Sequence, residues 1–116
     1  MASTKPLIGI STNEITNFNG RQVSHSTGLR YVEAVKKFTD GIPILIPSYI
    51  NDEDLDQLLS KIDGLVLTGG RANVEPHHFG GNPFPSDEPI DVGRDEIVLK
   101  IIPKCVNLGM PIFGIC

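Results

Sequence analysis

Four short apolar runs place the strongest constraint on how this chain can fold. They cover residues 7–11, 42–47, 64–68 and 110–116. Each run is apolar at odd and at even positions, so a strand formed from it would need cover on both of its faces. Strands covered in this way belong to parallel sheets with helices on either side. We therefore expect the four runs to form one buried, mostly parallel sheet.

Amphipathic segments separate these runs and predict three helices. The first begins near Thr27 and stops at about Gly41. Asn51 or Asp52 can cap the second, because both side chains accept hydrogen bonds from free backbone N–H groups at a helix start. The third opens at Asp91.

Two stretches lack helical or strand periodicity and predict loops. The first runs from the end of the first strand to about Ser26, and the second covers residues 71–90 and is rich in proline and glycine. Loops as long as the second are usually functional. Pro103 is expected to bend or divide the third helix, because proline lacks the N–H that a helix interior needs.

This order of strands and helices predicts an α/β fold of the doubly wound, flavodoxin-like type, with right-handed crossovers. In such sheets a ligand lies beyond the carboxyl ends of the strands. Residues 11–13, the pair Gly69-Gly70 and Cys116 all fall at such ends. We expect them to meet at one edge of the sheet.

Composition excludes some classes of function. The chain has 116 residues, the size of one domain or part of one, with 14 acidic and 10 basic side chains and a formal charge of -4. That balance offers no basic face for nucleic acid. No apolar run approaches the roughly 20 residues that a membrane-spanning helix requires. We expect a cytoplasmic protein without a nucleic-acid or membrane partner.

Cys116 is the residue with the clearest chemical potential. Gly114-Ile115-Cys116 ends a predicted buried strand and forms the first half of a nucleophile elbow, in which a sharp turn lifts the side chain clear of the sheet. A thiol at such a turn meets the N-terminus of a following helix, which favours the thiolate. From this tripeptide alone a buried core cysteine is equally compatible.

Several stretches together resemble a known family. Residues 111–116, Pro-Ile-Phe-Gly-Ile-Cys, resemble the Pro-x-x-Gly-Ile-Cys of class I glutamine amidotransferases. Further stretches resemble the gamma-glutamyl-gamma-aminobutyrate hydrolase branch of that family, and they are residues 31–35, 41–47, 63–70, 73–80 and 93–95. The resemblance spans nearly the whole chain in order, which is more specific than any single motif.

The resemblance implies an enzyme in which Cys116 attacks the side-chain amide carbonyl of a gamma-glutamyl substrate and forms a thioester. It implies that Gly70 donates a backbone N–H to the oxyanion, with Gly69 beside it keeping the loop close to the substrate. No cofactor and no metal are implied. The histidine and glutamate of the family lie far beyond the cysteine, so His25, His77 and His78 do not match them.

Other residues have simpler interpretations. A Gly-Gly pair alone is most often a tight turn, and the spacing of a nucleotide-binding glycine loop is missing. His77 and His78 are favoured as exposed loop residues over metal ligands. Arg94-Asp95 is either a cap and surface pair or a pair that orders the long loop. Cys105 lies on a helical apolar stripe and is expected to be buried.

The predicted sheet needs further cover, because a buried parallel strand at Cys116 cannot leave an edge and a face bare in water. We expect residues 1–116 to be the N-terminal part of one domain whose C-terminal half is the partner, and a homodimer is also open. Two other functions are open as well. One is a glutaminase domain that supplies ammonia to a synthase, and the other is a non-catalytic doubly wound binding module.

Overall fold

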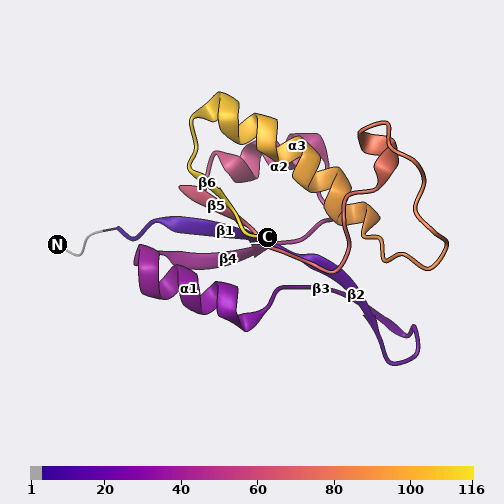
Figure 1. Cartoon of the computed structure of the whole chain (residues 1–116). Helices are drawn as coiled ribbons and strands as arrows, with labels where there is room; N and C mark the ends of the chain where they lie inside the picture. The colour runs from indigo at the N-terminus through magenta and orange to yellow at the C-terminus, as the bar shows by residue number, and fades with distance from the viewer. Residues whose placement is uncertain (1–3) are drawn as a thin grey trace.

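A four-stranded parallel sheet forms the centre of the protein in the computed structural model, which describes residues 4–116 (Figure 1). The strands are β1 (Leu7–Ser11), β4 (Ile42–Ile46), β5 (Gly64–Leu67) and β6 (Ile112–Gly114). Their order across the sheet is β4-β1-β5-β6. Each coincides with one of the four apolar runs, so the predicted parallel sheet is confirmed.

Three helices cover the sheet on both faces, as a doubly wound fold requires. They are α1 (Leu29–Thr39), α2 (Asp52–Leu59) and α3 (Val92–Leu108). Helix α1 lies on one face, and α2 and α3 lie together on the other (Figure 1). The predicted α/β, doubly wound architecture is therefore confirmed. No helix in the described part of the chain is long and apolar enough to cross a membrane.

Helix starts and ends follow their capping chemistry. The Asn51 side chain accepts a hydrogen bond of 2.8 Å from the Asp54 N–H and so caps α2. The Asp91 side chain accepts one of 3.1 Å from the Arg94 N–H at the start of α3. Gly109 ends α3 with a φ of 66°, a conformation that glycine adopts without steric cost.

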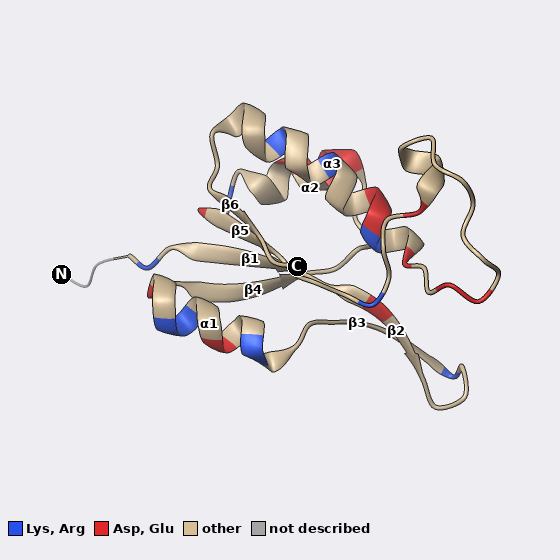
Figure 2. Cartoon of the chain, viewed as in Figure 1, with Lys and Arg blue, Asp and Glu red and all other residues tan. Residues whose placement is uncertain are grey.

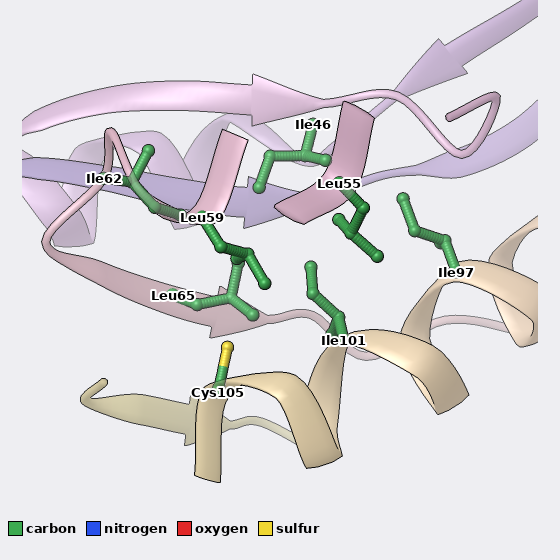
Figure 3. Packing of buried hydrophobic residues seen from close by; sticks show 8 residues of the cluster. All are labelled: Ile46, Leu55, Leu59, Ile62, Leu65, Ile97, Ile101 and Cys105. Carbon is green, nitrogen blue, oxygen red and sulfur yellow. The ribbon is translucent and has the colours of Figure 1, made fainter. Parts of the chain in front are cut away.

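The main hydrophobic core lies between the sheet and the pair α2 and α3 (Figure 3). Its buried members come from two strands, both helices and the α2–β5 connection. They are Ile46, Leu55, Leu59, Ile62, Leu65, Ile97, Ile101 and Cys105. Cys105 is fully buried, which confirms its prediction as a small core residue.

One predicted loop contains regular structure instead. Residues that follow β1 form an antiparallel hairpin of β2 (Asn13–Asn17) and β3 (Gln22–Ser26). The prediction of an irregular loop to Ser26 was wrong, because backbone pairing forms these strands without an apolar face. The turn of the hairpin has three successive positive φ angles, at Phe18, Asn19 and Gly20.

Three smaller differences concern α3, the second loop and β4. Helix α3 continues through Pro103, so the proline does not divide it. The segment 71–90 is irregular as predicted, apart from one short 3-10 turn, η1 (Pro76–His78). Strand β4 is an edge strand, and Ile42 and Leu45 on it are partly exposed although cover on both faces was expected.

Charges of both signs are distributed over the helices (Figure 2). Basic residues lie on α1 and α3, and acidic residues lie on all three helices. This distribution matches a chain with a small negative net charge.

Candidate functional site

The carboxyl ends of the central strands meet at one edge of the sheet and bring the predicted site residues together. Strand β5 is followed by Thr68-Gly69-Gly70, and neighbouring β6 is followed by Ile115-Cys116. The Ile115 N–H donates to the Leu67 carbonyl at 2.9 Å and continues the pairing past the end of β6. A Cβ placed on Gly69 would lie 3.8 Å from the Cys116 carbonyl carbon. The nucleophile candidate and the glycine pair are therefore neighbours.

A pocket of about 230 Å³ opens at this edge. It is lined by the predicted site residues Cys116, Gly69 and Gly70, with apolar surface from Val98 and Ile115. Cys116 is exposed at this pocket. Among the residues described, no histidine lines this pocket.

The turn Thr68–Gly70 is held by side chains from three elements. Ser11 Oγ, at the end of β1, accepts a hydrogen bond from the buried Thr68 N–H at 2.9 Å. Arg94 Nη2, from α3, donates to the Thr68 carbonyl oxygen. Tyr31, from α1, accepts the Gly69 N–H on its hydroxyl at 3.1 Å. The backbone of the turn is therefore fixed on both faces of the sheet.

The first turn of α3 connects the segments that surround the pocket. Asp91 caps α3 with one carboxylate oxygen and accepts the Glu14 N–H of β2 with the other, at 3.0 Å. Asp95 accepts the Glu75 N–H of the long loop at 2.9 Å. Since Arg94 holds the turn after β5, three side chains of one helical turn organise the hairpin, the long loop and the glycine turn.

The burial and the contacts of Asp95 decide between the two interpretations of the Arg94-Asp95 pair. Its side chain is 5% exposed, so it is not part of a surface pair, and the cap is Asp91. The contact with Glu75 instead supports the interpretation in which this pair orders the long loop. A hydrogen bond from a backbone N–H to a carboxylate is stronger than one between neutral groups, so this contact holds the loop against α3.

The histidines of residues 4–116 do not line the pocket of the glycine turn. His77 is exposed, as predicted for a loop residue. His78 Nε2 is 3.9 Å from Asp95 Oδ2, and His25 Nε2 is 3.2 Å from Glu14 Oε2 on the hairpin. Within residues 4–116, no group of three or more His, Cys, Asp or Glu side chains is arranged to hold a metal ion.

The two thiols differ in their surroundings. Burial raises the pKa of the Cys105 thiol above its ordinary value, because an ionised sulfur in the core would lose its hydration. Cys105 Sγ also lies 3.9 Å from the sulfur of Met110. Cys105 is therefore an unreactive core residue, whereas Cys116 faces the pocket.

Sequence patterns predicted Ser11 at the same edge of the sheet as the glycine turn, and its bond to the Thr68 N–H agrees with that prediction. They did not identify Tyr31 as a neighbour of the turn. Tyr31 lies far from residues 68–70 in the chain, and only the tertiary placement of α1 brings its hydroxyl to the Gly69 N–H. Asp91 was predicted at the start of its helix, but its second bond, to the hairpin, has no local signal.

Comparison with known proteins identifies the family of the chain. Residues 6–116 match the family model described as Peptidase C26. Over 78 residues, 66% of this chain and 30% of the relative, the chain is 42% identical to gamma-glutamyl-gamma-aminobutyrate hydrolase PuuD of Escherichia coli (strain K12). The corresponding hydrolase of Shigella flexneri is 41% identical over the same shares of both chains.

A third relative matches along almost the whole chain. Protein NtpR of Enterococcus hirae is 30% identical over 115 residues, which are 96% of this chain and 46% of that protein. The chain therefore spans less than half the length of the relatives that it matches.

Proposed function

Because the chain belongs to the Peptidase C26 family, we propose that its protein hydrolyses a gamma-glutamyl amide bond through a thioester on Cys116. The observation that carries the proposal is that Cys116, Gly69 and Gly70 line the same pocket. The names of two relatives, which are gamma-glutamyl-gamma-aminobutyrate hydrolases, support the choice of a gamma-glutamyl substrate.

The proposed reaction begins with attack of the Cys116 thiolate on the amide carbonyl carbon. A C–S bond forms, and the π electrons of the carbonyl move to its oxygen. The Gly70 N–H stabilises this oxyanion, an interaction whose loss typically costs about 2.7 to 4 kcal/mol of barrier. When the tetrahedral adduct collapses, the C–N bond breaks, and the amine leaves with a proton from a general acid.

Water completes the proposed cycle. It attacks the thioester carbonyl, a base removes its proton, and collapse releases the free gamma-carboxylate and the Cys116 thiolate. No histidine among the residues described lines the pocket. We therefore assign the acid and base to the part of the protein that lies outside this chain.

The test is turnover by the full-length protein of gamma-glutamyl-p-nitroanilide and of gamma-glutamyl-gamma-aminobutyrate. Cys116→Ala should abolish the release of p-nitroaniline, since no other exposed thiol lies in residues 4–116. Cys105→Ala is the matched control, because it removes a thiol from the core and leaves the pocket lining intact. It should retain most of the wild-type rate.

Each alternative has its own outcome in this experiment. Activity that persists in Cys116→Ala would contradict the proposed nucleophile. Turnover of glutamine that requires a partner synthase, without turnover of the gamma-glutamyl amides, would favour an ammonia-supplying glutaminase. Binding of these compounds without turnover by the wild-type protein would favour a non-catalytic module.

A further inference from the structure

The two glycines after β5 have different hydrogen-bond environments. The Gly69 N–H donates to the Tyr31 hydroxyl at 3.1 Å. Within residues 4–116, the Gly70 N–H has no hydrogen-bond partner. A donor that already has a partner must break that bond before it can serve another acceptor. Gly70 is therefore the glycine whose N–H is free at the pocket.

Two side chains secure this arrangement from opposite faces of the sheet. Tyr31 reaches the turn from α1, and Arg94 reaches it from α3, where Nη2 donates to the Thr68 carbonyl oxygen. The Arg94 guanidinium also lies directly against Gly70, since a Cβ at that residue would overlap Nη1. A Cβ there would also come within 2.9 Å of Asn13 Oδ1. The close approach explains why position 70 is glycine.

We infer that Tyr31 and Arg94 are positioning residues that hold the turn Thr68–Gly70 so that Gly70, and not Gly69, donates to the reacting carbonyl oxygen. The inference rests on the proposed function, because it identifies the side chains that hold the oxyanion donor of that reaction. Fixed donors stabilise an oxyanion without reorganising during the reaction, so loosening the turn should slow the chemical step. Tyr31 and Arg94 act through the backbone and need not touch the substrate.

The first experiment measures kcat and KM for gamma-glutamyl-p-nitroanilide with full-length Tyr31→Phe and Arg94→Gln. Each variant should lower kcat by about tenfold to a hundredfold with KM within about twofold, because misplacing a catalytic group affects mainly the transition state. Arg94→Lys keeps one donor for the Thr68 carbonyl and should recover part of the loss. A rise in KM with unchanged kcat would overturn the inference.

Matched controls use the same substitutions at exposed sites. Arg30→Gln changes an exposed arginine of α1, and Tyr49→Phe changes a tyrosine that is 90% exposed. Both should leave kcat and KM within about twofold of the wild type. A gamma-glutamyl aldehyde, which forms a tetrahedral adduct with a thiolate, should lose affinity in Tyr31→Phe and Arg94→Gln by the same factor as kcat.

A double-mutant cycle tests the contact between Arg94 and Gly70. Gly70→Ala keeps the backbone N–H but forces the guanidinium away, so it should lower kcat at least tenfold. In an Arg94→Ala background the same change should cost less than about threefold, because the guanidinium is gone and only the end of the flexible Asn13 side chain must shift. Additive effects of the two substitutions would contradict the proposed clamp.

Amide hydrogen exchange provides a readout that does not depend on activity. The Gly69 amide should exchange more slowly than the Gly70 amide in the wild type, and Tyr31→Phe should accelerate it at least tenfold. Equal exchange of the two glycines, or no effect of Tyr31→Phe, would overturn the inference even for an active enzyme. Failure of the proposed function would instead appear as a wild-type protein without turnover but with the expected exchange pattern.

Discussion

Cys105 and Cys116 carry the same thiol group, but their surroundings predict different reactivity. Cys105 is fully buried between α3 and the sheet, and its pKa is raised by that burial. Cys116 is exposed at the pocket. Because the thiolate is the reactive form of cysteine, a raised pKa and lack of access both make Cys105 inert.

Alkylation of the folded protein should therefore be selective. Iodoacetamide at mildly alkaline pH should modify Cys116 first, because Cys116 is exposed and Cys105 is buried. Peptide mass spectrometry of the folded full-length protein would locate the label, and both cysteines should react once urea unfolds it. Preferential labelling of Cys105 in the folded state would contradict the assignment of Cys116 as the reactive thiol.

The first turn of α3 is the element that most influences the shape of the site. Its residues Asp91, Arg94 and Asp95 bond to the hairpin, the glycine turn and the long loop. Local pattern predicted the helix and its start, because capping and periodicity are properties of neighbouring residues. Ordering of the long loop was one of two interpretations that the sequence left open for Arg94-Asp95, and the contact of Asp95 with Glu75 supports it. The contacts of Asp91 with the hairpin and of Arg94 with Thr68 could not be predicted, since their partners are more than fifteen residues away in the chain.

A comparison of two caps tests the connecting role of Asp91. Asp91→Ala should reduce the free energy of unfolding by about 2 to 4 kcal/mol, because it removes a helix cap and leaves the Glu14 N–H unpaired. Asn51→Ala removes only the cap of α2 and should cost about 1 kcal/mol. Urea unfolding of the full-length protein measures both values.

Limited proteolysis then localises the effect. Asp91→Ala should increase cleavage in the hairpin at residues 13–26, whereas Asn51→Ala should not. Equal costs for the two substitutions, with no change in cleavage of the hairpin, would mean that Asp91 is only a helix cap.

At the scale of the whole molecule, one face of the sheet is incompletely covered. An apolar groove of about 320 Å³ lies between α1 and β6 and includes Val35, Phe38, Phe113 and Ile115. Phe113 is 65% exposed and Phe38 is 77% exposed. Exposed apolar surface of this kind typically marks an interface. We propose that a C-terminal half of the same domain covers this groove. The proposal agrees with the coverage of the relatives, since the chain spans less than half of their length.

Residues 1–116 expressed alone should accordingly aggregate and lack amidase activity. Co-expression with the remainder of the protein should restore both solubility and activity. Sedimentation and turnover of gamma-glutamyl-p-nitroanilide measure the two properties. Phe113→Asp should improve the solubility of the isolated chain, whereas Phe18→Asp at the hairpin tip is the control and should not. A monomeric, cooperatively folded and active fragment would contradict the proposal, and a stable dimer through this groove would favour a homodimer.

The sequence by itself determined the parallel sheet, the three helices, where the second and third of them begin, and the burial of Cys105. Those features follow from apolar periodicity and capping, which act between residues close together in the chain. It also placed Cys116 and the Gly69-Gly70 pair at strand ends, which the topology brings to one edge.

Only the tertiary structure decided that β2 and β3 pair, and that Tyr31, Ser11 and Arg94 hold the turn after β5. It also decided which of the two glycines keeps a free N–H. These outcomes depend on hydrogen bonds between polar groups far apart in the chain. Such bonds leave no periodic signal in the sequence, because many residues carry a suitable donor or acceptor. Only the packing of helices on both faces of the sheet selects which of them becomes the partner.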